Sequence, residues 1–202
     1  MLNGLRHEAM RELSEMQSSL GHTSDALWYT NECGFIRTNL QALLWDSSAN
    51  LFKACTSPTT NALRHDLVAS TYIAMVGACS NGIAQRIAFT LSTNFTTSAF
   101  RHGSMSHLPP GEFWYEQLPG AVGQGFYQNG GYWPMFGTWA ANVIRTVNQT
   151  QGDDLIKQLA GRYRAQSTNL VPPEWENGMS RGAPQYLDSA TVPMMYFQGI
   201  NR

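Results

Sequence analysis

The sequence is short of charged residues and of long apolar runs, and each shortage argues against a class of protein. Only 13% of the 202 residues are charged, with 13 basic against 14 acidic side chains. A duplex-binding protein needs a surplus of Lys and Arg on one face to neutralise phosphates, so no nucleic-acid partner is expected. No run of 18 uninterrupted apolar residues occurs, so no membrane-spanning helix is expected.

Cysteine is also scarce. Cys33, Cys55 and Cys79 form no CxxC pair, and their odd number argues against a disulfide framework. No His or Cys recurs at zinc-ligand spacing, and no Asp-rich motif of the DDxxD kind, as terpene cyclases use, is present. We therefore expect neither a metal ion nor another cofactor.

Apolar and aromatic residues are plentiful and favour a single folded domain over residues 1–202. The hydrophobic fraction is 43%, and the aromatic residues include six Trp and eight Tyr. A chain of this length buries about 70% of its extended surface on folding, which is enough for stability without disulfides. Apolar residues recur at helical spacing and show no convincing strand ladder, which predicts an all-α fold. The expected helices cover residues 1–20, 24–45, 66–79, 81–91, 134–147, 153–163 and 186–199.

The connections between these helices alternate between short and long. If successive helices pack antiparallel as hairpins, all long loops lie at one end of the molecule and all short ones at the other. Loops on a rigid helical scaffold are where binding and catalytic residues concentrate. A functional site is therefore expected among the long connections, which cover residues 46–65, 92–133 and 166–185.

The most unusual segment is the loop at residues 123–134, which we call the aromatic loop. It holds four aromatic residues, three amides and four glycines directly before a predicted helix. Aromatic rings stack on the apolar face of a sugar, and amides hydrogen-bond its hydroxyl groups. This composition indicates a saccharide site that includes Tyr127, Gln128, Asn129 and Trp133. A loop whose aromatic residues only pack on the scaffold is the alternative.

Three segments resemble the six-hairpin, (α/α)6-barrel glycosidase superfamily, in its glycogen-debranching, invertase and rhamnosidase-like branches. Residues 127–133 (YQNGGYW) resemble its Y-x-N-G-x-x-W loop. Residues 43–52 resemble its LLWD…G-L-Y/F segment, with Asn50 in place of the glycine. Residues 173–190 resemble its closing P-E-x-x-x-G…G-x-x-Q-x-x-S-A stretch. The matches follow the family's order, and they imply a partial (α/α)6 toroid of antiparallel helical hairpins.

The resemblance also implies roles for residues of the closing stretch. The glutamate of its P-E element acts as the general base of a glycoside hydrolase or lies beside that base, which points to Glu174. Glu176 competes for this role, and a surface salt bridge is the structural alternative for either residue. Trp175 and Gln185 are expected to contact the saccharide. Between Pro173 and Trp175, the Glu174 carboxylate would be partly desolvated, which raises the pKa of such a group.

The general acid is harder to identify. Asp66 lies at the start of a predicted helix, where an N-cap role is favoured over a place in the cleft. Glu112 and Glu116 lie in the longest loop beside aromatic residues, where they would line a sugar cleft or remain at its edge. His102 and His107 lie in the same polar loop, and we expect both to be solvated.

A complete barrel of this family has more helices than the seven predicted here, and the resemblance covers its C-terminal half. We therefore expect a partner for this half, either a missing N-terminal half or a second copy of the chain. The leading hypothesis is a glycoside hydrolase, or a fragment of one, that binds a saccharide and uses carboxylate acid/base catalysis. The alternative is a non-catalytic carbohydrate-binding or structural helical protein.

Overall fold

The computed structural model describes residues 1–56, 64–96, 98–114, 123–165, 173–178, 182–184 and 186–197. Seven helices lie within these ranges, and each one overlaps a helix predicted from apolar spacing. The helix-rich part of the prediction is therefore confirmed. The helices are α1 (Leu2–Ser19), α2 (Thr23–Leu44), α3 (Leu67–Met75), α4 (Asn81–Asn94), α5 (Pro134–Arg145), α6 (Gln149–Ala165) and α7 (Leu187–Phe197).

Two helices begin at residues whose side chains cap them. The Asp66 carboxylate accepts a hydrogen bond from the Ala69 backbone N–H at 2.9 Å, at the start of α3. The Ser80 hydroxyl accepts one from the Ile83 N–H at 3.4 Å, at the start of α4. Each bond satisfies an N–H that has no partner inside the helix. The capping role favoured for Asp66 is confirmed.

Asp66→Ala is expected to lower the free energy of unfolding by about 1 kcal/mol, because the Ala69 N–H loses its acceptor at the buried start of α3. Ser80→Ala is the matched control, and a smaller loss is expected because its hydrogen bond is longer. Urea unfolding of the two variants and the wild type measures both effects. A loss at Asp66 no greater than at Ser80 would contradict this account.

The all-α prediction is wrong in one respect, because two small antiparallel sheets lie between the helices. β1 (Trp45–Asp46) pairs with β2 (Leu51–Phe52), and β4 (Ser104–Ser106) lies between β3 (Phe100–Arg101) and β5 (Tyr132–Trp133). These strands of two or three residues are too short for alternating burial to appear in the sequence.

Asn50, in the turn between β1 and β2, has a φ of 54°. This is the left-handed conformation, which glycine adopts with the least steric strain and which Asn tolerates better than most residues. Asn50 stands where the resembling motif has glycine. Asn50 can therefore replace the glycine of the motif without preventing the turn.

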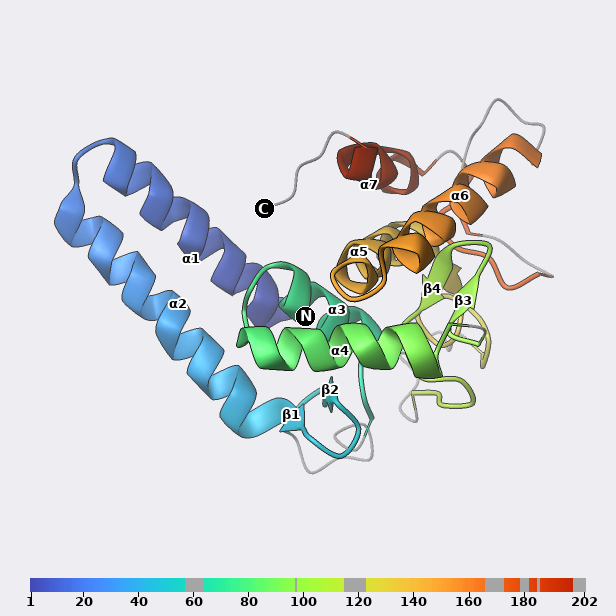
Figure 1. Cartoon of the computed structure of the whole chain (residues 1–202), viewed down its shortest axis with the longest axis horizontal. Helices are drawn as coiled ribbons and strands as arrows, with labels where there is room; N and C mark the ends of the chain where they lie inside the picture. Colours follow the sequence, from blue (N-terminus) through green and yellow to red (C-terminus); the bar gives the residue numbers. More distant parts are fainter. Residues whose placement is uncertain are drawn as a thin grey trace.

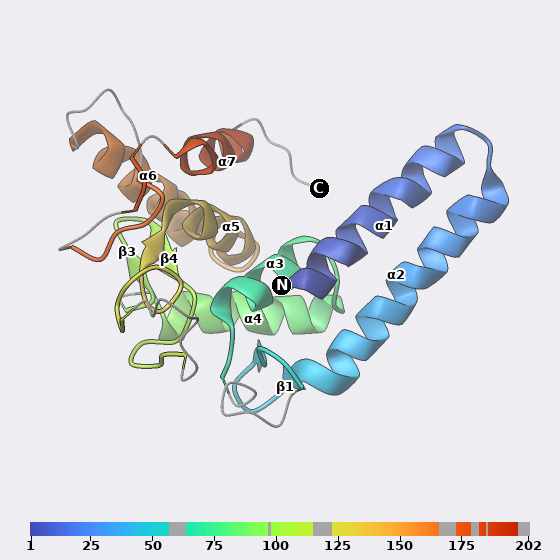
Figure 2. The ribbon, with the colours of Figure 1, turned by 180° about the vertical axis from the view of Figure 1, so that it is seen from behind.

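Successive helices form the hairpins α1–α2, α3–α4 and α5–α6. The α1–α2 hairpin projects from the rest of the molecule, while α3, α4 and α5 pack together (Figure 1). Seen from behind, the same hairpin again stands apart, with the start of α1 beside α3 (Figure 2). In Figure 1, β1 and β2 lie below α4 and the strands β3 and β4 lie below α6, and both sheets are far from the short α1–α2 connection.

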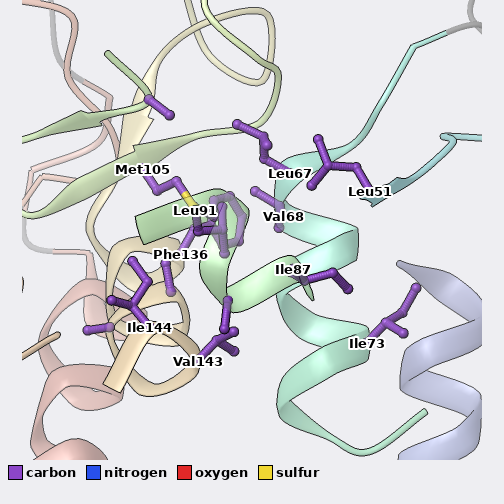
Figure 3. Packing of buried hydrophobic residues seen from close by; sticks show 14 of the residues in the cluster. Leu51, Leu67, Val68, Ile73, Ile87, Leu91, Met105, Phe136, Val143 and Ile144 are labelled. Atoms are coloured by element: carbon purple, nitrogen blue, oxygen red, sulfur yellow. The ribbon is translucent and has the colours of Figure 1, made fainter. Parts of the chain in front are cut away.

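The hydrophobic core lies where α3, α4 and α5 meet, and β2 and β4 close one side of it (Figure 3). α3 is buried on nearly every side, as its run of small and apolar residues predicts. α5 contributes Phe136 and Ile144 to the same cluster. The core residues exposed by less than 2% include Leu67, Val68, Ile73, Ile87, Leu91, Met105 and Ile144.

Candidate functional site

Backbone pairing brings two of the three resembling segments together. Tyr132 and Glu176 exchange N–H···O=C hydrogen bonds of 2.8 and 2.9 Å. The segment 173–178 therefore lies against β5, at the end of the aromatic loop. The Asn177 side chain donates to the Gly125 carbonyl oxygen at 3.0 Å, and the Arg101 guanidinium donates to the Asn177 carbonyl at 2.6 Å.

The glycines of the aromatic loop allow it to fold back on itself. The Gly131 N–H donates to the Tyr127 carbonyl oxygen at 2.8 Å, and a Cβ at Gly131 would lie 2.5 Å from that oxygen. Only a residue without a side chain fits this approach. Tyr127 itself has a φ of 46°, a strained value for an aromatic residue. The strain marks Tyr127 as a residue held by its surroundings.

The aromatic rings of both segments pack against one another. The Tyr127 ring centre lies 5.0 Å from that of Trp133 and 6.4 Å from that of Trp175. Trp133 is buried, and its indole N–H donates to the Tyr127 carbonyl oxygen at 3.3 Å. Trp175 is also buried, whereas Tyr127 is only half-buried. Of these three rings, Tyr127 therefore has the most surface left for a ligand.

The two loop amides predicted to bind the saccharide, Gln128 and Asn129, have different surroundings. The Asn129 side chain is buried, and its Oδ1 accepts a hydrogen bond from the Trp114 backbone N–H at 2.8 Å. Gln128 is exposed, and its carbonyl oxygen accepts a hydrogen bond from the Trp114 indole at 3.1 Å. Asn129 thus fixes the loop to the neighbouring segment, whereas the Gln128 side chain faces solvent.

The two candidate glutamates also differ. Glu176 is 3% exposed, and its Oε2 accepts a 2.7 Å hydrogen bond from the Arg162 guanidinium of α6. Glu174 is half-buried, and its Oε2 accepts a 3.3 Å hydrogen bond from the Ala183 backbone N–H. Glu176 is thus neutralised inside the protein, while Glu174 keeps a carboxylate that water can reach.

Tyr186 lies near Glu174 and was not among the residues predicted from the sequence. Burial raises the pKa of the Tyr186 hydroxyl, and the charges of Asp188 and Glu174 add to the effect. Tyr127 contributes in the same direction, so both phenols lie within electrostatic range of one another. The only sequence signal for Tyr186 is its place directly after the glutamine of the closing motif.

The remaining predicted carboxylates do not gather at Glu174 in the described part of the chain. Asp66 caps α3, and Glu112 forms a 3.2 Å ion pair with Arg64. Glu116 and Gln185 lie outside the described residues.

The expectation that His107 is solvated is wrong. His102 is exposed as predicted, but His107 is only 5% exposed, and its ring centre lies 4.7 Å from that of Phe136. Burial lowers the pKa of His107, and the nearby Asp66 carboxylate opposes this effect. The cause is the short strand β4, which carries the chain into the core just before His107.

Asp46 and His65 form a polar pair at the β1–β2 turn, and this pair was not predicted from the sequence. His65 Nε2 lies 3.1 Å from Asp46 Oδ2, and the Ser48 hydroxyl donates to Asp46 Oδ1 at 2.6 Å. These hydrogen bonds, that of Ser48 first, hold the pKa of the Asp46 carboxyl well below its usual range. Asp46, the acidic residue of the LLWD segment, therefore stabilises this turn through its hydrogen bonds.

Within the described ranges, no three His, Cys, Asp or Glu side chains form a group that would hold a metal ion. No helix in those ranges is both long and apolar enough to cross a membrane. Comparison of the chain with models of known protein families finds no match, and comparison with curated protein sequences finds none either.

Proposed function

We propose that the chain is part of a glycoside hydrolase in which Glu174 acts as the general base. The observation that carries this proposal is the contrast between the two neighbouring glutamates. Glu176 is buried and paired with Arg162, whereas Glu174 is half-buried and lies within electrostatic range of the Tyr186 phenol. A general base must reach a water molecule and must be free to accept a proton.

In the proposed reaction, the Glu174 carboxylate removes a proton from water while the water oxygen attacks the anomeric carbon of the sugar. The glycosidic bond breaks in the same step, and the general acid gives its proton to the leaving oxygen. The Ala183 N–H fixes one carboxylate oxygen and leaves the other for that water. Tyr127 and the exposed Gln128 side chain contact the sugar from the aromatic loop. An inverting hydrolase places its general acid about 6.5–9.5 Å from the base. We assign that acid to the barrel half that would complete the toroid.

Glu174→Gln, made in the complete enzyme, is expected to abolish turnover and to leave saccharide binding intact. The amide keeps the shape and the Ala183 hydrogen bond but accepts no proton, and loss of a general base costs about 10²–10⁴-fold in rate. Release of reducing sugar measures turnover, and titration calorimetry measures binding.

The control for this substitution is Asp154→Asn, which changes an exposed carboxylate of α6 in a surface pair with Lys157. It is expected to alter neither activity nor binding. Unchanged turnover in Glu174→Gln would refute the role of Glu174. If the wild-type protein binds saccharides without releasing reducing sugar, the non-catalytic carbohydrate-binding alternative is supported instead.

A further inference from the structure

The strongest feature outside the proposed site is a histidine buried where three helices meet. His7 of α1 is 2% exposed, and neither Nδ1 nor Nε2 has a hydrogen-bond partner within the described part of the chain. On the same face of α1, one turn earlier, Gly4 packs against Tyr72 of α3, and a Cβ there would lie 3.1 Å from its ring. The Cys33 thiol of α2 lies 3.4 Å from the His7 carbonyl oxygen.

The charges around His7 favour its neutral form. Arg37 of α2 and Arg11 of α1 both disfavour a proton on the imidazole, and Glu8 opposes them. α3 faces this region with the uncharged side chain of Tyr72. Burial is the largest effect, and together these lower the pKa of His7 below its ordinary value. A protonated His7 would bury a charge with two N–H donors that find no acceptor among the described residues, which is a costly arrangement.

Besides this junction, α1 is held by partly buried side chains along α2, and Met10 packs against the main hydrophobic core. Gly4 and His7 are the fully buried residues of α1. Farther along, the Ser14 hydroxyl donates to the Ala26 carbonyl oxygen, and Arg6 pairs with Glu32 at the surface. Exposed ion pairs of this kind contribute little. α2, in contrast, places Ile36 and Leu40 in the main hydrophobic core. Separation of α1 alone therefore uncovers the edge of the core at Ile73 but leaves the packing of α3, α4 and α5 in place, which makes it a local opening.

We propose that α1 is an acid-releasable helix, which packs on α2 and α3 while the His7 imidazole is neutral and separates from them when it gains a proton. This inference is independent of the glycosidase proposal. The direction of this pH dependence follows from the linkage between proton binding by His7 and the packing of α1. The released state binds the proton at the ordinary pKa of about 6.5 and the packed state only at a lower pH, so the packing weakens as the pH falls below about 6.5.

Thiol labelling tests the proposal, because release of α1 uncovers Cys33. Cys79 is buried in the main core and serves as the internal reference. The protein is labelled with a pyridyl disulfide, which still reacts with thiols in mild acid, and mass spectrometry quantifies each cysteine. Between about pH 7.5 and pH 5.5, we expect the ratio of Cys33 to Cys79 labelling to rise, because the lowered pKa of His7 makes proton uptake favour the released state. The rise is expected to vanish in His7→Leu.

A ratio that does not change with pH, or a rise that persists in His7→Leu, would overturn the proposal. If His7→Leu does not fold, nuclear magnetic resonance of the wild-type protein decides the question. The proposal requires that the His7 imidazole gains its proton over the same pH range in which the amides of α1 lose protection from hydrogen exchange. Protonation of His7 while those amides stay protected would refute it, as would equal loss of protection in α1 and α5.

Discussion

Gly137→Ala is expected to destabilise the fold more than any other substitution considered for this protein. Gly137 lies in α5, where an added Cβ would overlap the Gly103 carbonyl oxygen and lie 3.0 Å from the Ser104 Cα. Both neighbours are backbone atoms, one in the β3–β4 turn and one at the start of β4, so no side chain can rotate to make room. We expect a loss of about 4 kcal/mol or more in the free energy of unfolding, at the upper end of single-substitution effects.

Gly161→Ala is the matched control, because it is the same substitution in α6 with open space around it. No atom lies within 4 Å of the Cβ that it would add. Ala has a higher helix propensity than Gly, so a gain of about 0.5–1 kcal/mol is expected. Urea unfolding of both variants separates the steric effect from the effect of helix propensity. Equal changes in the two variants would show that α5 does not approach the β3–β4 turn as described.

Arg162→Met is expected to produce the second large effect. The Glu176 side chain is 4% exposed and loses its cationic partner in this variant. Removal of one member of a buried ion pair typically costs about 3–5 kcal/mol, because the remaining charge stays buried without compensation. Glu176 is paired through its backbone to β5, so the same loss is expected to loosen the aromatic loop. Thermal unfolding and tryptophan fluorescence measure these two consequences.

Two further variants show whether burial is the cause. Lys157→Met breaks the exposed pair with Asp154, and little change in the free energy of unfolding is expected because solvent screens such a pair. The double variant Arg162→Met, Glu176→Leu removes both charges and is expected to recover most of the lost stability. The account fails if Arg162→Met is as mild as Lys157→Met, or if the double variant is no more stable than Arg162→Met.

Helices were predictable because apolar spacing is a local signal, but their ends depend on particular contacts. α6 begins at Gln149, four residues before the expected acidic start. The reason is the Asn148 side chain, which accepts a hydrogen bond from the Gln151 N–H at 3.1 Å and caps the helix. α3 ends at Met75, earlier than expected, because the chain turns at Gly77 with a φ of 68°.

The sequence placed the aromatic loop and the P-E segment at one candidate site, and in the structure they do lie side by side. It left open the choice between Glu174 and Glu176, because that choice depends on contacts between distant segments. Glu176 is buried by its pairing with Tyr132 and neutralised by Arg162, which lies on a separate helix. Burial of His107 depends in the same way on packing against α5.

The packing of rings against the aromatic loop also affects the circular dichroism and the fluorescence of the protein. Trp133 and Trp175 are buried, and each lies edge-on to Tyr127, whereas Trp28 on α2 is 54% exposed. Fixed, closely spaced chromophores in an asymmetric setting give near-ultraviolet circular dichroism, and a solvated indole emits at longer wavelength than a buried one. Trp133 and Trp175 therefore report on the assembly of the loops, and the emission of Trp28 reports on the surface of the projecting hairpin.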